Sequence, residues 1–298
     1  MTDSHGLLLV HAHHDDEVTT TGITMARAAA NGGRVTLVTC TLGEEGDVVV
    51  EDLSHLKDHD GAALAQHRIG ELDAAMVALG VTDYLRLGHD GKYRDSGMAV
   101  DEQGRPIPVP TPHESAFWRA DLREAATDLV TVIRDRKPAV LITYDDYGNY
   151  GHPDHIQAHR VAMYATQLAA APSYRRDLGE AWQIPRVLWS TMSESWFREG
   201  LRWMRDNDAE NRWTDIDPEG PMPPMVAPDE DIAVTVRAPE FAARKLEAFR
   251  AHASQISEDS PFFTMARLFG DEAWATEWFK LGAGTPLPPG ATDIFAGL

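Results

Sequence analysis

The chain has 298 residues, and 43% of them are hydrophobic, which is enough to form one large or two modest domains with a full core. It carries 47 acidic residues against 27 Lys and Arg, and its net charge of -20 argues against nucleic acid or an anionic membrane as a partner. Cys40 is the only cysteine, so no internal disulfide is expected, and no apolar run reaches the length of a membrane-spanning helix. These features predict a cytoplasmic protein.

Apolar runs of strand length alternate with helical patterns through the first half of the chain. The runs are continuously apolar, as in strands that are buried on both faces. The expected strands are residues 7–12, 34–40, 84–88 and 140–143. The expected helices are residues 20–31, 60–79 and 115–136. This alternation predicts an α/β fold with a Rossmann-like, mostly parallel, doubly wound sheet.

The character of the chain changes in its last part. Trp, Arg and Pro become frequent, and the regular alternation of strand and helix patterns is lost. Two further strands are expected at 186–192 and 232–238, and a helix is expected at 239–253. We therefore predict two parts, a larger domain and a smaller α/β segment that caps the sheet, at residues 1–172 and 173–298.

Two clusters of His and Asp follow two of the expected strands directly. Residues 11–17 read HAHHDDE after the first strand, and residues 151–155 read GHPDH after the strand at 140–143. In open α/β sheets, ligands bind outside the carboxyl ends of the strands. A mixed set of nitrogen and oxygen donors at such an edge suits Zn²⁺ or a similar divalent ion. The loop after the first strand has no G-x-G-x-x-G motif, which argues against dinucleotide binding.

Three side chains from these clusters form the expected ligand set. His13 and Asp16 are three residues apart at a turn, and His155 completes the three ligands that are typical of a catalytic zinc site. Asp15 lies between two of these ligands and can point toward a water molecule rather than the ion. The alternative is that these acids cap the following helix. A second His cluster downstream favours the metal site.

The second cluster offers more histidines than one ion needs. His152 and His155 bracket Asp154, so the histidine that does not bind metal can serve as a general acid or as a donor to an oxyanion. The carboxylate of Asp154 is expected to orient that histidine and to raise its pKa. Tyr150 either adds a phenolic donor or packs in the loop, and the spacing alone does not choose between these roles.

Arg68 interrupts an aliphatic stripe on the helix expected at 60–79. It stands between Leu64 and Leu72 on the side that should face the core. One interpretation is that its side chain extends along apolar surface to reach solvent. The other is that it points from the upper edge of the sheet toward a ligand. The pattern alone favours the first interpretation.

The two clusters together resemble the LmbE/PIG-L family of zinc N-acetyl-sugar deacetylases, whose first motif is usually written A-H-P-D-D-E. This chain has His14 where that motif has Pro, which removes a rigid turn residue but none of the usual ligands. The resemblance extends over most of the chain and is weakest at 190–225. Its supporting segments are residues 38–48, 66–72, 94–99, 143–155 and 251–255.

The resemblance implies a metal centre in the domain at 1–172. His13, Asp16 and His155 would bind one zinc ion per subunit, with Fe²⁺ as an alternative in vivo. Asp15 would be the general base that acts on water. Residues 173–298 would contribute to the substrate cleft.

The resemblance also implies roles for residues around the ion. His152 would be the acid or the oxyanion stabiliser, and Asp154 would tune it. Tyr150 would polarise the amide carbonyl. Arg68 and Asp95 would contact hydroxyl groups of the substrate, in contrast to the interpretation that the helical pattern favours for Arg68.

The implied substrate is a small amino-sugar inositol. The expected reaction removes the N-acetyl group of GlcNAc-inositol and gives GlcN-inositol, a step of mycothiol biosynthesis. One alternative is the related mycothiol S-conjugate amidase, which carries a Lys where this chain has Thr20. Others are a deacetylase of another N-acetyl amino sugar and a non-catalytic sugar-binding module, although such a module would not need Asp15. The sequence leaves the oligomeric state open, a homo-oligomer included.

Overall fold

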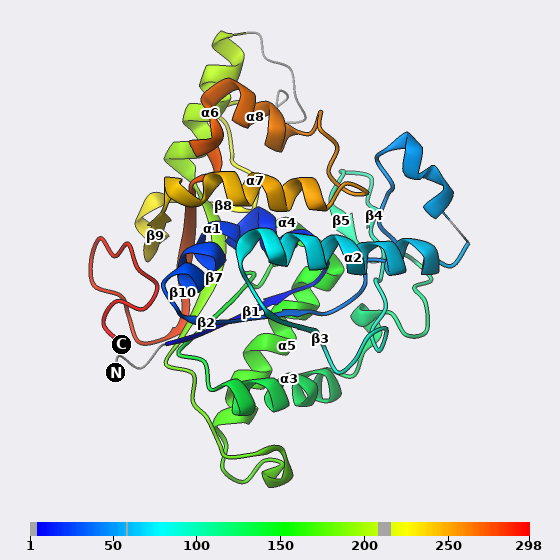
Figure 1. The fold of residues 1–298 in the computed structure, drawn as a ribbon, viewed down its shortest axis with the longest axis vertical. Coiled ribbons are helices and arrows are strands. Elements are labelled where there is room, and N and C mark those ends of the chain that lie inside the picture. The colour runs from blue at the N-terminus through cyan, green and yellow to red at the C-terminus, as the bar shows by residue number, and fades with distance from the viewer. Residues whose placement is uncertain (1–4, 58, 208–215) are drawn as a thin grey trace.

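The computed structural model of the chain describes residues 5–57, 59–207 and 216–298, which fold around one twisted central sheet (Figure 1). Its strands lie in the order β3-β2-β1-β6-β7-β10-β9, and β8 pairs with β7 at one end. The strand bounds are β1 Gly6–His11, β2 Arg34–Thr39, β3 Asp83–Arg86, β6 Val140–Thr143, β7 Arg186–Ser193, β8 Val226–Ala227, β9 Val234–Arg237 and β10 Thr276–Gly284. A separate small hairpin consists of β4 Ala99–Val100 and β5 Pro106–Ile107.

The sheet is mostly parallel, which confirms the fold class predicted from the sequence. The strand pairs β1–β2, β1–β6, β2–β3 and β6–β7 are parallel, whereas β10 runs antiparallel to both β7 and β9. β7 pairs in register with β6, so the sheet continues from the first 172 residues into the rest of the chain. The proposed division at residue 172 therefore falls in the connection between two neighbouring strands.

The central strand β1 contributes side chains to two separate core layers. Leu7 and Leu9 pack into the layer on one face of the sheet, and Leu8 and Val10 pack into the layer on the other face. This division follows from the alternation of side chains along a strand. Because both faces are covered, each residue of β1 is buried, as its apolar sequence predicts.

Helices cover both faces of the sheet (Figure 1). α3 and α5 pack together on one face, and α1, α2 and α7 pack together on the other. In the view of Figure 1, α6 and α8 lie beyond α7, at the upper end of the molecule. The helix bounds are α1 Asp16–Ala30, α2 Ala62–Leu79, α3 Leu122–Arg136, α4 Gly148–Gly151, α5 Pro153–Ala170, α6 Glu194–Asp206, α7 Ala242–Ala251 and α8 Pro261–Phe269.

Several boundaries differ from the sequence expectations. α1 begins at Asp16, four residues before the Ala-rich segment, because the chain turns sharply at Asp15 and the helix starts at once. The helix expected from residue 115 is interrupted, and α3 starts only at Leu122 after the Asp121 side chain caps its first turn. β10 and α5 were not expected at all.

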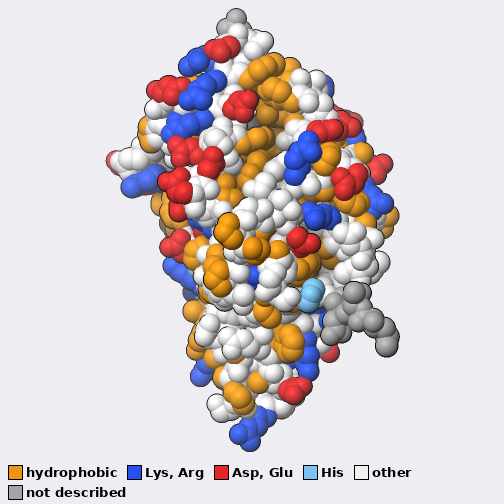
Figure 2. All heavy atoms as spheres, turned by 90° about the vertical axis from the view of Figure 1, so that its left-hand side faces the viewer, with side chains coloured by type: hydrophobic (Ala, Val, Ile, Leu, Met, Phe, Trp, Pro, Cys, Tyr) orange, Lys and Arg blue, Asp and Glu red, His pale blue; other side chains and the backbone are white. Residues whose placement is uncertain are grey.

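Charged side chains of both signs are interspersed on the molecular face shown in Figure 2. The described residues also form exposed ion pairs, such as Arg202 with Glu219 at 2.7 Å and Arg175 with Asp177 at 2.6 Å. Such pairs contribute at most about 1 kcal/mol each to stability. Within the described ranges, every helix is too short or too polar to span a lipid bilayer.

Candidate metal centre

The two His–Asp clusters meet at the carboxyl ends of β1 and β6. These strands are parallel neighbours, with Leu7 opposite Val140 and Leu9 opposite Ile142. The first cluster occupies the turn between β1 and α1, and the second leads into the first turn of α5. The pairing of the two strands therefore brings together residues that are about 140 positions apart in the sequence.

The three predicted ligands lie side by side. Asp16 lies between two imidazoles, because its Oδ2 is 3.4 Å from His13 Nδ1 and its Oδ1 is 3.3 Å from His155 Nε2. The two histidines are buried, with Asp16 largely shielded beside them. Burial alone would raise the pKa of Asp16, but His155 and His13 hold it well below its usual range. The carboxylate is therefore charged, as a metal ligand must be.

A fourth donor, His152, lies close to this group. One ring nitrogen each of His13, His152 and His155 falls within 4.8 Å of the others. The backbone N–H of Asp154 donates to His152 Nδ1 at 3.1 Å, so the ring proton of neutral His152 must be on Nε2. Both nitrogens of His152 are then occupied. The hydrogen bonding thus favours Asp16 over His152 as the third ligand.

The donor set fits a divalent metal ion. Neither ring nitrogen of His155 has a hydrogen-bond partner among the described residues, although the ring is buried. Buried polar atoms are rarely left without a partner, and an ion between these side chains would supply one. Two imidazoles and a carboxylate are the ligand types that zinc takes in catalytic sites.

Asp154 contacts a different histidine from the one expected. Its Oδ2 lies 3.3 Å from His13 Nε2, and its carboxylate also accepts bonds from the backbone N–H and the hydroxyl of Ser96. The expectation that this carboxylate orients His152 is therefore wrong; only the backbone N–H of Asp154 reaches that ring. Burial, followed by His13 and His155, lowers the pKa of His152 to about 2, opposite to the predicted direction.

The contact between the Asp154 carboxylate and His13 determines which nitrogen of the His13 ring faces Asp16. A carboxylate beside Nε2 favours a proton there, and an ion beside Asp16 would then bind the lone pair of Nδ1. Asp95 lies on the same side, with its Oδ1 3.7 Å from His13 Nε2 and also accepting the Gly97 N–H. The structure thus places Asp95 beside a predicted ligand, in a buried position. Its predicted contact with substrate hydroxyls stays a prediction.

Asp15 lies next to the predicted ligands, and neither it nor Asp16 belongs to the two groups of side chains at metal-binding distance found among the described residues, which are His13, His152 and His155, and His13, Asp95 and Asp154. It precedes α1 with φ 103° and ψ -27°, and its side chain makes no capping hydrogen bond, so the capping interpretation is wrong for this residue. Its Oδ2 lies 3.3 Å from the Arg68 guanidinium. Burial raises the pKa of Asp15 to about 6, a range that suits a base near neutral pH.

Arg68 does not reach solvent, so the interpretation favoured by its helical pattern is wrong. Its side chain is 2% exposed, and its guanidinium donates to the backbone oxygens of Gly43 and His14 as well as lying against Asp15. A Cβ at Gly43 would lie 2.1 Å from the guanidinium, so only glycine leaves room for it. Arg68 therefore connects α2 to the metal-binding turn through its contacts with His14 and Asp15.

Two aromatic residues flank His155. Tyr144 stacks on the His155 ring at a centroid distance of 4.2 Å and accepts the Ala12 N–H. It therefore contacts the segments that follow both β1 and β6. Tyr150 meets His155 edge-on at 4.9 Å and is 39% exposed. The sequence analysis missed Tyr144; its place directly after a strand that ends beside the motif was the available signal. Tyr150 is thus partly exposed beside His155, and its donor role stays a prediction.

A cleft of about 670 Å³ opens beside the metal-binding residues. Asp15, Asp16, Tyr150 and His155 line it on one side. The other side comes from the last part of the chain and is mainly apolar and aromatic, with Met192, Met225, Ile256, Phe262, Trp274 and Trp278. The sheet and the C-terminal segment thus both contribute to the walls.

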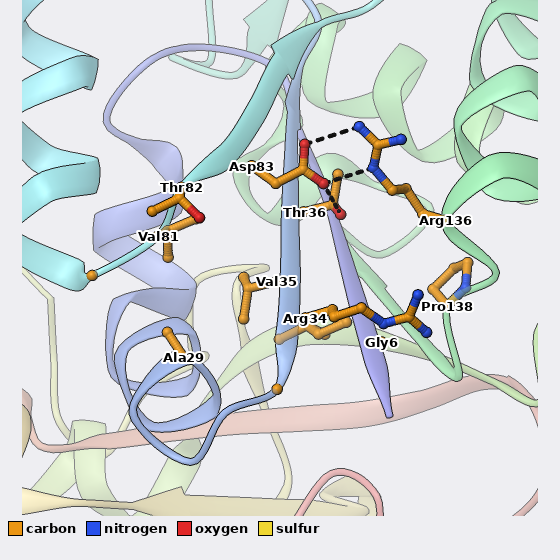
Figure 3. Close-up of a pocket in the computed structure, with 13 residues that line it drawn as sticks. Gly6, Ala29, Arg34, Val35, Thr36, Val81, Thr82, Asp83, Arg136 and Pro138 are labelled. Carbon is orange, nitrogen blue, oxygen red and sulfur yellow. Dashed lines mark hydrogen bonds and ion pairs between the residues drawn. The ribbon is translucent and has the colours of Figure 1, made fainter. Parts of the chain in front are cut away.

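A second hollow lies at the opposite, amino-terminal edge of the sheet (Figure 3). Its most prominent charges are already paired, because Asp83 binds Arg136 at 2.7 Å and accepts the Thr36 hydroxyl at 2.7 Å. It lies far from the His–Asp clusters, since it is lined by the starts of β1, β2 and β3. We assign it no ligand.

Comparisons with known proteins identify the family of this chain. The family described as "PIG-L: GlcNAc-PI de-N-acetylase" matches residues 8–166, which include all the predicted ligands. A 1D-myo-inositol 2-acetamido-2-deoxy-alpha-D-glucopyranoside deacetylase from Kribbella flavida is 52% identical over 98% of this chain and 97% of its own length. One of the same name from a Nocardioides species is 52% identical over the full length of both chains.

Solved structures share the fold at lower identity. N,N'-diacetylchitobiose deacetylase from Pyrococcus horikoshii has a TM-score of 0.60 and 20% identity, covering 94% of this chain and 84% of its own. A 4-carboxy-2-hydroxymuconate hydratase from Pseudomonas putida has a TM-score of 0.58 and 16% identity, covering 96% and 100%. The fold alone therefore does not define the reaction. The sequence relationship does define the family, and this chain belongs to the PIG-L family of de-N-acetylases.

Proposed function

We propose that this protein is a zinc-dependent hydrolase that removes the N-acetyl group of GlcNAc-inositol and releases acetate and GlcN-inositol. The observation that carries this proposal is the position of Asp15, a partly exposed carboxylate that lines the cleft beside the predicted ligands and is paired with Arg68. A site that only binds metal and sugar has no need of such a group. The names of relatives at 52% identity over nearly the whole chain support the inositol-linked substrate.

The residues divide the chemistry of amide hydrolysis between them. A divalent ion held by His13, Asp16 and His155 would supply Lewis acidity and lower the pKa of water. Zn²⁺ suits these donors, and Fe²⁺ is an alternative occupant. Asp15 accepts the proton of the attacking water and then delivers it to the leaving nitrogen, so that the C–N bond breaks to give a free amine.

Two donors stabilise the negative charge that develops on the carbonyl oxygen. His152 carries its proton on Nε2 because its Nδ1 accepts a backbone hydrogen bond. It therefore acts as a neutral donor, in keeping with its lowered pKa. Tyr150 stands at the cleft entrance and polarises the same oxygen through its hydroxyl. The wall contributed by residues 173–298 holds the rest of the substrate.

The substrate is tested by a direct comparison of three compounds. Zinc-loaded protein should release primary amine from GlcNAc-inositol with a higher kcat/KM than from free GlcNAc or a mycothiol S-conjugate. The expectation follows from the shared name of the full-length relatives and from Thr20, which lines the cleft where the amidase carries a Lys. A preference for the S-conjugate would identify the amidase, and a preference for free GlcNAc would identify another amino-sugar deacetylase.

The role of Asp15 is tested by separating metal content from rate. Asp15→Asn should keep near-stoichiometric zinc while kcat falls at least about 10²-fold, the usual scale for loss of a general base. Asp16→Asn is the matched control and should lose zinc together with rate. Both are measured by elemental analysis and steady-state kinetics. Loss of zinc from Asp15→Asn would make Asp15 a ligand and contradict the assignment.

Asp154 is tested by its effect on metal affinity. Because its carboxylate contacts His13, Asp154→Asn should weaken zinc binding about 10- to 100-fold, as outer-shell substitutions typically do. Competition with a chromogenic chelator measures this affinity. Unchanged zinc affinity in Asp154→Asn would contradict this role of the carboxylate.

A further inference from the structure

Asp15 has a backbone conformation that few residues with a side chain adopt. Its φ is 103°, in the left-handed region, although it is not a glycine. Such strain persists only where the surroundings hold the residue in place. The conformation matters here because it lets Asp15 and Asp16 point in different directions, one beside the ligand group and one within it.

A buried carboxylate holds this backbone. Glu17 accepts the Asp15 N–H at 2.8 Å through its Oε2. Its other oxygen, Oε1, lies 2.7 Å from Nε2 of His252. Both Glu17 and His252 are 0% exposed, and neither lines the cleft. The Glu17 carboxylate is thus shared between the backbone of the proposed base and one imidazole.

His252 comes from the far end of the chain and is itself anchored. It follows the last residue of α7, 235 positions after Glu17. Its Nδ1 has no hydrogen-bond partner among the described residues, so its ring contact with Glu17 is the polar contact that the structure gives it. Two residues on, Ser254 donates from its backbone and its hydroxyl to Glu71 on α2, both at 2.7 Å.

Helix α2 also holds the side chain of Asp15. Arg68, one turn before Glu71 on α2, lies against the Asp15 carboxylate and binds the backbone oxygen of His14. The backbone of Asp15 is thus held through Glu17 and His252, and its side chain is held through Arg68. Ser254 ties these two supports together.

We propose that Glu17 and His252 are positioning residues for the general base: the His252–Glu17 pair holds the Asp15 backbone in its left-handed conformation and so aims the Asp15 carboxylate at the attacking water. This inference rests on the proposed function, since it takes Asp15 as the base. It assigns a role to the last residue of HAHHDDE and to His252, neither of which belongs to the ligand set or lines the cleft.

The first test compares two substitutions of Glu17. Glu17→Met removes the acceptor at similar size, and kcat should fall about 10- to 100-fold, the range for losing a buried hydrogen bond to a charged group. Zinc stoichiometry and KM should change little, because the ligands and the cleft walls stay in place. Glu17→Gln keeps an oxygen that can accept the Asp15 N–H and should recover most of the rate.

The second test separates positioning from general stability. In an Asp15→Asn background the base is already lost, so adding Glu17→Met should lower kcat by no more than about twofold. A change of that size is within the usual error of additivity between two substitutions. Glu17→Met combined with His252→Gln should lose no more than the larger single loss. Thr36→Val, which removes a partly buried hydrogen bond at the opposite edge of the sheet, is the control and should lower Tm but not kcat (Figure 3).

Three results would overturn the proposal: unchanged kcat in Glu17→Met, loss of zinc from Glu17→Met, or a full further loss of rate in the Asp15→Asn background. A crystal structure of Glu17→Met, or of His252→Gln if the first variant does not fold, tests it without activity. Asp15 leaving the left-handed region supports the proposal, and an unchanged Asp15 backbone contradicts it. An inactive wild-type enzyme would refute the proposed function, whereas this structural comparison would still decide the positioning role.

Discussion

The parallel pairing of β1 with β6 is the constraint on which the rest of the site depends. It places the loops after both strands at one edge of the sheet, so that Asp16 lies within 3.4 Å of His13 and within 3.3 Å of His155. Each strand is buried on both faces, which fixes its register against its neighbours. The packing of the core therefore determines where the loops of the metal centre lie.

The site concentrates charges that burial would otherwise make unstable. Asp15, Asp16, Asp95 and Asp154 lie close together at the carboxyl edge of the sheet. Asp95 and Asp154 are buried and the other two are partly shielded, so an unpaired carboxylate there is costly. Each has a partner from another element: a ligand histidine for three of them, and Arg68 for Asp15. A divalent ion would add positive charge where these groups converge. The same network that holds the ligands in place thus makes an ion favourable there.

The sequence predicted what local patterns encode. Continuous apolar runs indicated the parallel sheet, and two His–Asp motifs at strand ends indicated where a metal would bind. Apart from the approach of His155 to Asp16, several contacts between distant segments were interpreted wrongly or missed. The helical pattern did not show that Arg68 binds the backbone of Gly43, and spacing within GHPDH did not show that the Asp154 carboxylate turns to His13. The Glu17–His252 pair joins residues 235 positions apart, and no local pattern marks such a contact.

The central claim is that His13, Asp16 and His155 hold one ion while Asp15 remains outside it. Crystals of the zinc-loaded protein, measured on both sides of the zinc absorption edge, test this claim most directly. The account predicts one anomalous peak per chain, bonded at about 2.0–2.2 Å to these three side chains, with Asp15 not coordinated. A peak bound by Asp15, or one between His13, Asp95 and Asp154, would contradict it.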